Sequence, residues 1–104
     1  MIEEQYYHQQ FLLAAERLTA QLMDEGEYQR ALDVTYKILG EDSLWESAYR
    51  AQMTIFHEMG RPSMIREVYK QCQDVFRRQM DSQVSEITAN LFSALLPETP
   101  SKSE

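Results

Sequence analysis

The chain has 104 residues, of which 43% are hydrophobic and 26% charged, and it contains three glycines and three prolines. That length provides for one domain with a single modest core, and the scarcity of glycine and proline favours a mainly helical fold. Ten basic and seventeen acidic residues give a net charge of −7, so phosphate groups would be repelled by most of the surface and we expect no direct nucleic acid binding.

Two glycines divide the chain into helical hairpins. Gly26 and Gly60 each separate two stretches in which apolar residues recur with helical spacing. The interval between the two glycines equals the period of the tetratricopeptide repeat, in which each repeat is a pair of antiparallel helices. The spacing therefore predicts two such hairpins in a right-handed stack.

The first hairpin is predicted from residues 4–25 and 28–39. Gly26 would end the first helix, because glycine adopts the left-handed conformation without a side-chain clash, and Gly40 would end the second in the same way. The inward faces are predicted to carry Phe11, Ala15, Leu18 and Leu22 in the first helix and Tyr28, Ala31, Leu32, Thr35 and Leu39 in the second.

The second hairpin is predicted to begin at a capping box. Ser43 and Glu46 have the spacing at which the serine oxygen accepts from the amide of Glu46 while the glutamate reaches back, which places the helix start near Leu44. Pro62 suits the first turn of the next helix, predicted over 62–80. The inward residues are Ala48, Gln52, Ile55, Phe56 and Met59, followed by Ile65, Val68, Tyr69, Cys72, Val75 and Phe76.

A shorter fifth helix is predicted over 84–96, after a break at Asp81 or Ser82. Its inward residues would be Ile87, Leu91 and Leu95, and it would cover the apolar face that ends a repeat stack. Residues 97–104 contain two prolines and no large apolar side chain, which predicts a disordered tail or a linker. The predicted fold is therefore all-α, with five helices in one domain over residues 1–96.

The sequence contains only weak motifs for a catalytic or metal-binding site. His57-Glu58 begins a zinc-protease motif, but position 61 is arginine where the second histidine would stand. His8, His57 and Cys72 lack metal-ligand spacing. We therefore predict no catalytic residues, no metal and no cofactor. Arg66, Lys70, Arg77 and Arg78 are interrupted by Glu67 and Asp74, which is typical of a solvated, salt-bridged helix face.

The chain resembles a known bacterial family. The segments ERL (16–18), GEYQRAL (26–32), DSLWE (42–46) and EVYK (67–70) are similar to the bacterial transcriptional activation domain of antibiotic-regulatory activators. The resemblance covers about residues 6–96, and it continues through MDSQVS (80–85), Thr88 and Leu91-Phe92. Ser43 replaces a proline of the family pattern, while Asp81 and Val84 replace a glycine and a proline, so we expect a different bend before the fifth helix.

The resemblance implies a regulatory or oligomerisation module that acts through protein contacts. Its partners would be a second copy of the chain, an upstream DNA-binding domain or the transcription machinery. Family members carry a winged helix-turn-helix domain upstream, so this chain is either an excised domain or one that works without a DNA-binding domain of its own. The alternative is a free-standing repeat adaptor that binds a peptide or helix of another protein.

The chain is expected to be cytoplasmic. No apolar run approaches the roughly 20 residues that a membrane span needs, and the acidic N-terminus does not have the pattern of a signal peptide. A single cysteine, Cys72, is consistent with a reducing compartment.

Two surfaces are candidates for partner binding. In tetratricopeptide stacks the first helix of each hairpin lines a concave groove, which here would contain Leu13, Glu16, Ala20, Met23, Ser47, Arg50, Thr54 and His57. The second is an aromatic patch, formed by Tyr6, Tyr7 and Phe11, that a second copy could cover in a homodimer. The alternative for the groove residues is that they are simply the exposed sides of two helices.

Overall fold

The computed structural model describes residues 2–97, with the side chains of residues 2 and 3 excepted. Within this range there are five helices and no strand: α1 (Ile2–Asp24), α2 (Tyr28–Glu41), α3 (Glu46–Glu58), α4 (Pro62–Met80) and α5 (Glu86–Leu95). The predicted all-α class and its five helices are confirmed. The predicted tail lies outside the described residues from position 98 onward.

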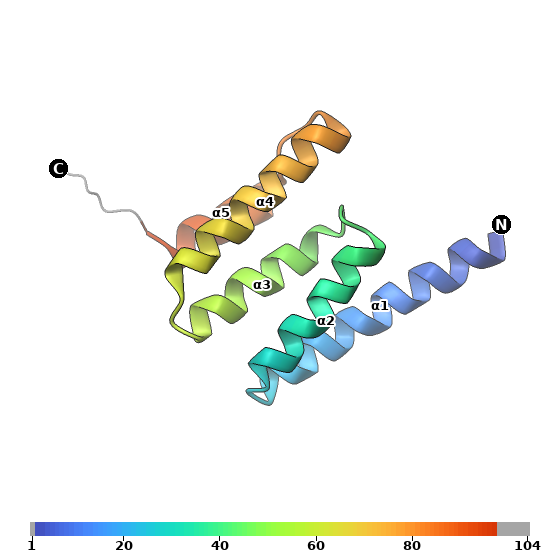
Figure 1. The fold of residues 1–104 in the computed structure, drawn as a ribbon, viewed down its shortest axis with the longest axis horizontal. Helices are drawn as coiled ribbons and strands as arrows, with labels where there is room; N and C mark the ends of the chain where they lie inside the picture. The colour runs from blue at the N-terminus through green and yellow to red at the C-terminus, as the bar shows by residue number, and fades with distance from the viewer. Residues whose placement is uncertain (1, 98–104) are drawn as a thin grey trace.

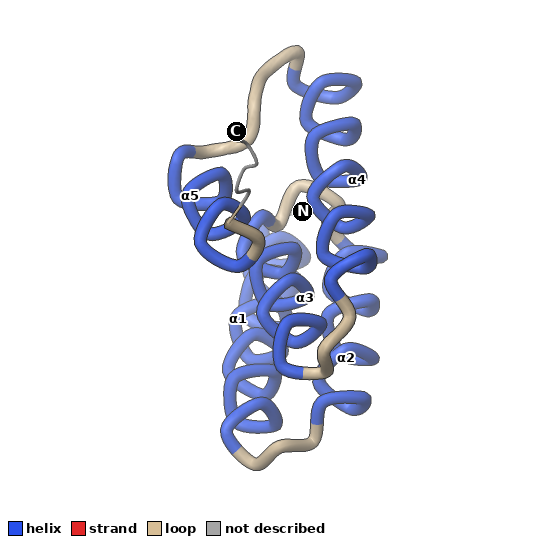
Figure 2. The backbone as a smooth tube through the Cα atoms, turned by 90° about the vertical axis from the view of Figure 1, so that its left-hand side faces the viewer, coloured by secondary structure: helices blue, strands red, loops and turns tan. Residues whose placement is uncertain are grey.

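The helices form two layers, one of α1, α3 and α5 and the other of α2 and α4. Helices α1 and α2 make one antiparallel hairpin, α3 and α4 make the next, and α3 packs against all four other helices (Figure 1). In Figure 2, α1 and α5 lie on one side of α3, whereas α2 and α4 lie on the other. The layer of α1, α3 and α5 is therefore the one in which the predicted groove residues must be sought.

The two glycine turns have the same backbone geometry. Gly26 has φ 76° and Gly60 has φ 71°, both in the left-handed region. The amide of Glu27 donates to the carbonyl of Leu22 at 2.8 Å, and the amide of Arg61 donates to the carbonyl of Phe56 at 2.9 Å. These bonds satisfy carbonyls that the helix end leaves free. The repeat seen in the sequence is thus present in the hydrogen bonding of the turns.

Gly40 does not end α2, contrary to the prediction. The helix continues through Gly40 to Glu41, and the extended residue Asp42 (φ −150°) closes it by donating its amide to Ile38. The carboxylate of Asp42 then accepts from the amide of Leu44 at 3.0 Å. The stop signal is the aspartate turn, because such side chains offer the backbone an alternative to the helical hydrogen bond.

The core fills the space between the two layers. Its members include Leu22, Leu32, Tyr49, Met53, Ile65 and Cys72, and a second group near the start of α3 contains Leu12, Ala15, Ile38 and Ala48. The predicted inward face of α1 is partly wrong, since Phe11 and Leu18 are exposed whereas Leu12 and Thr19 are buried. Helix α1 is rotated by about one residue from the predicted face, because residues 12, 15, 19 and 22 meet its neighbours.

The start of α3 also differs from the prediction. The helix begins at Glu46, and its N-cap residue, Trp45, makes no side-chain capping hydrogen bond. Ser43 does not cap it either: its carbonyl accepts from the hydroxyl of Tyr49 at 2.8 Å. The capping box is absent because the carboxylate of Glu46 is turned toward α5 instead.

The break after α4 falls where the sequence predicted it. Asp81 adopts the left-handed conformation with φ 51°, so an aspartate occupies the position where the family pattern has glycine. Helix α5 then begins at Glu86, slightly later than predicted. Its predicted inward residue Ile87 is 67% exposed, because Thr88 and not Ile87 is the buried residue of this helix.

Candidate functional site

A groove of about 360 Å³ lies on the layer formed by α1, α3 and α5. Helix α3 contributes five of its lining residues and α1 contributes four, while α2 and α5 contribute two each. The lining residues are Glu16, Thr19, Ala20, Met23, Thr35, Ile38, Ser47, Ala48, Arg50, Ala51, Thr54, Ile87 and Leu91.

The structure brings most of the predicted groove residues together. Six of the eight line this groove: Glu16, Ala20, Met23, Ser47, Arg50 and Thr54. Leu13 is half-buried and His57 is exposed, and neither lines it. The prediction missed Ile87 and Leu91 of α5. Both were placed in the core, because no sequence signal separated a groove residue from a core residue on that helix.

Small side chains shape the groove. Ala20, Ser47, Ala51 and Thr54 occupy positions on α1 and α3 where bulkier residues would fill the space. Met23, Ile87 and Leu91 add flexible or branched apolar surface. A groove of this kind can accept the apolar ridge of a helix or of an extended segment.

Glu16 connects α1 to the beginning of α3. Its Oε1 atom accepts a hydrogen bond from Nε1 of Trp45 at 2.8 Å and another from the hydroxyl of Ser47 at 2.9 Å. These bonds join residues that are far apart in the sequence. They fix the position of an exposed carboxylate at one end of the groove.

Glu46 fastens α5 to α3 on the other side. Its Oε2 atom accepts from the amide of Ser85 at 2.9 Å, from the hydroxyl of Ser85 at 2.8 Å, and from the hydroxyl of Thr88. Ser85 in turn caps α5 by accepting from the amide of Thr88 at 3.3 Å. The guanidinium of Arg50 donates to Thr88 at 2.8 Å and lies 4.0 Å from Glu46. This cluster holds the α5 wall of the groove in place.

The carboxylate of Glu46 is favoured in its charged form. Burial raises the pKa of Glu46, but the hydrogen bonds from Thr88 and Ser85, together with the nearby Arg50 charge, more than offset this and hold the pKa below its ordinary value. Glu46 is therefore ionised at neutral pH. Its negative charge also compensates the positive charge of Arg50 beside the groove.

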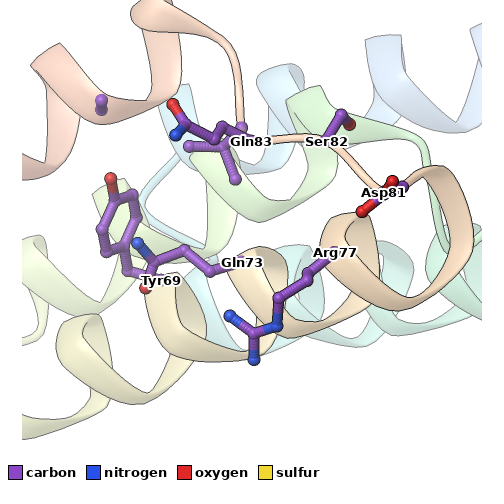
Figure 3. A pocket seen from close by; sticks show the side chains of 8 residues that line it. Tyr69, Gln73, Arg77, Asp81, Ser82 and Gln83 are labelled. Carbon is purple, nitrogen blue, oxygen red and sulfur yellow. The ribbon is translucent and has the colours of Figure 1, made fainter.

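A second hollow, of about 550 Å³, lies between α4 and the segment that leads to α5 (Figure 3). Polar side chains dominate it, among them Gln73, Arg77, Asp81 and Gln83. Tyr69 forms one wall and stacks on Phe92 of α5 with ring centroids 4.0 Å apart. Arg77 donates to Asp74 at 2.7 Å, so this arginine of the basic group on α4 is salt-bridged as predicted.

The aromatic patch lies at the other end of the molecule, near the start of α1. Tyr6, Tyr7 and Phe11 are 59%, 67% and 47% exposed, and the Tyr6 and Tyr7 rings meet edge to face at 5.5 Å. Tyr7 and Phe11 are one helical turn apart on one face, whereas Tyr6 points to a different side.

The remaining titratable residues are dispersed. The described residues contain no group of three or more His, Cys, Asp or Glu side chains placed to hold a metal ion. Cys72 is buried at the α3–α4 contact, and burial raises the pKa of its thiol to about 12. None of the helices in the described part of the chain has the length and apolarity required to cross a bilayer.

A family model matches nearly the whole chain. The family model described as bacterial transcriptional activator domain matches residues 2–96. No curated protein and no solved structure matches the chain. The matched range contains the five helices of the described residues and every residue that lines the groove.

Proposed function

The chain belongs to the bacterial transcriptional activator domain family, and from that premise we propose that it is a regulatory module that works by binding other proteins. Its partners are the DNA-binding domain with which it operates, the transcription machinery, and a second copy of itself. It performs no chemistry of its own, and it acts in the cytoplasm, where transcription takes place.

The observation that carries this proposal is the groove between α1, α3 and α5. Its lining combines small and apolar side chains with two ionisable groups, Glu16 and Arg50, both held by hydrogen bonds within the molecule. Interfaces gain most of their affinity from a few apolar anchors in such hollows, while fixed charges at the margin set orientation. A helix or strand of a partner protein fits this combination.

The electrostatics of the chain favour a protein over nucleic acid as the occupant. The net charge is −7, and the exposed ionisable group at one end of the groove is the carboxylate of Glu16. The positive charge of Arg50 lies 4.0 Å from Glu46 and is compensated by it. A phosphate backbone would meet little net attraction here.

A tethering experiment tests the proposal. The chain is fused to a heterologous DNA-binding domain whose site lies upstream of a weak bacterial promoter, and reporter output is measured. We expect activation by the wild type and its loss in Ala51→Trp, which fills the groove from the middle of α3. Gln71→Trp is the matched control, because Gln71 is exposed on α4, away from the groove.

Circular dichroism and thermal unfolding of the purified variants show whether each remains folded. Absence of activation by the wild-type fusion would contradict the proposed function. Full activation by a folded Ala51→Trp protein would refute the groove as its location.

A further inference from the structure

An exposed apolar stripe runs along α1. Tyr7, Phe11 and Leu18 are 67%, 47% and 44% exposed, and the exposed residue Ala14 lies between the last two. Their spacing of four, three and four residues places all of them on one face of the helix. Glu16 and Ala20, which line the groove, lie on the opposite side of α1, so the stripe is a separate surface.

The stripe includes a part of α1 that the rest of the molecule does not cover. All side chains from residue 4 to residue 11 are exposed, and this end of α1 projects beyond the stack (Figure 1). A helical segment this short is marginal in water unless its apolar face packs against something. Two of the large side chains of the stripe, Tyr7 and Phe11, lie on this segment, and large exposed side chains so placed are typical of an interaction surface.

We propose that this stripe pairs with the same stripe of a second copy, with the two α1 helices antiparallel. The twofold axis passes between residues 11 and 14, so Phe11 of each copy lies against Ala14 of the other. The same axis places Tyr7 of each copy against Leu18 of the other. The inference deepens the proposed function, since it specifies the surface and the geometry through which the module self-associates.

Size complementarity supports the second copy as the occupant. The antiparallel register sets the large Phe11 against the small Ala14 and pairs two large side chains, Tyr7 and Leu18, at each end. Large residues facing small ones let helices approach closely with interlocked side chains. A parallel pair would instead place Phe11 against Phe11 and Ala14 against Ala14, which leaves the two helices unevenly spaced.

The helix dipoles favour the same orientation. The helix starts with the acidic residues Glu3 and Glu4, and Arg17 is the only lysine or arginine that precedes Arg30 in the sequence. A parallel pair would bring the acidic starts of both copies together, and it would align the two helix dipoles. The antiparallel pair opposes the dipoles, but it places each acidic start beside Asp24 and Glu25 at the end of α1 in the other copy, so the dipoles alone favour this orientation.

The interface is small and the dimer is correspondingly weak. Contacts restricted to one face of one helix fall below the roughly 1,200 Å² of a standard interface, so we expect dissociation constants on the order of micromolar. The dimer therefore forms when copies are brought together, as on adjacent DNA sites.

Sedimentation velocity over a concentration series tests the surface. The wild type should show a monomer–dimer equilibrium, and Phe11→Ala and Tyr7→Ala should each weaken it by at least about tenfold. Tyr36→Ala is the matched control, since Tyr36 is 51% exposed on α2 and lies outside the stripe. The inference is wrong if the wild type remains monomeric at several hundred micromolar, if the folded Phe11→Ala variant dimerises as the wild type does, or if Tyr36→Ala weakens the dimer equally.

A distance measurement tests the orientation. A spin label is attached at Glu4→Cys, while the native Cys72 stays unlabelled because it is buried and its pKa is about 12. In the antiparallel register Glu4 lies opposite residue 21 of the other copy, so the two labelled positions are separated by about 27 Å between Cα atoms. A separation of about 10 Å, the ordinary distance between the axes of packed helices, would mean a parallel pair and would overturn the inference.

The tethering assay uses Ala51→Trp in the groove and does not involve the stripe. A monomeric chain that still activates would therefore refute this inference and the second copy as a partner, and it would leave the proposed role of the groove intact. A dimeric chain that fails to activate would contradict the proposed function and leave this inference intact.

Discussion

Replacing Glu46 by glutamine should release α5 from α3. The wild-type carboxylate accepts hydrogen bonds from the amide and hydroxyl of Ser85 and from the hydroxyl of Thr88, and its side chain is only 17% exposed. Glutamine has nearly the same shape and retains one acceptor oxygen. The substitution therefore removes the negative charge while leaving the packing of the side chain in place.

The expected cost follows from the difference between charged and neutral hydrogen bonds. A hydrogen bond to a charged group contributes about 1.5–3 kcal/mol to stability, whereas a neutral one contributes about 0.5–1.5 kcal/mol. Three weakened bonds around one oxygen are not additive, and we expect a total loss of about 2 kcal/mol. For a domain of this size, that lowers the melting temperature by roughly 8–16 °C.

Thermal unfolding followed by circular dichroism measures the total effect. Amide hydrogen exchange shows where it occurs, since α5 should lose more protection than α3 or α4. Glu67→Gln is the matched control, because Glu67 is exposed on α4. If Glu46→Gln and Glu67→Gln melt at the same temperature, the carboxylate does not hold α5 and the reasoning is refuted.

Four further predictions concern pH, the glycines, DNA and the thiol. Folding lowers the pKa of Glu46, so the contribution of its carboxylate to the free energy of unfolding is complete above the unfolded-state pKa and is lost as the pH falls through the folded-state pKa. The difference in stability between the wild type and Glu46→Gln, measured by urea unfolding, should therefore shrink below about pH 4. A difference that is unchanged at about pH 3 would contradict this prediction. Gly26→Ala should lower the free energy of unfolding by about 1 kcal/mol because φ is 76°, whereas Gly40→Ala, within α2, should raise it by about 0.5–1 kcal/mol. Calorimetry that shows a change of the same sign for both variants would contradict the assignment of the turns. Fluorescence anisotropy with duplex DNA should show no binding at physiological salt, and micromolar, salt-dependent binding would disprove the partner class. Cys72 should react with a thiol reagent only at the rate of unfolding, so rapid reaction of the native chain would show that it is not buried.

The repeat architecture could be predicted from sequence because its signals are local. A left-handed glycine ends a helix wherever the chain needs a tight turn, and Gly26 and Gly60 both do so. The same register placed six of the eight predicted residues of α1 and α3 in the groove, but Leu13 and His57 do not line it.

The start of α3 was predicted wrongly because the hydrogen-bond partners of Glu46 are distant in the sequence. Ser43 and Glu46 match a local capping pattern, yet Glu46 binds Ser85 and Thr88, which lie 39 and 42 residues away. Only the docked position of α5 decides between these partners, and no local pattern encodes it.

Helix α1 presented a different ambiguity. Its sequence contains two interleaved apolar stripes, one with Leu12 and Thr19 and the other with Phe11 and Leu18. Helical periodicity fits both, and the contacts with α2 and α3 decide that the first is buried. The unburied stripe is the one that we assign to a second copy.

The most direct test of groove function is site-specific photocrosslinking from Thr54 during activated transcription. Thr54 lines the groove from α3, and a photoreactive residue placed there in the tethered activator should form a covalent adduct with an RNA polymerase subunit. The same residue at Gln71, on the exposed face of α4, should give little adduct with the polymerase. Equal adducts from both positions, or adducts from Gln71 alone, would contradict the account that the groove between α1, α3 and α5 is where this domain acts.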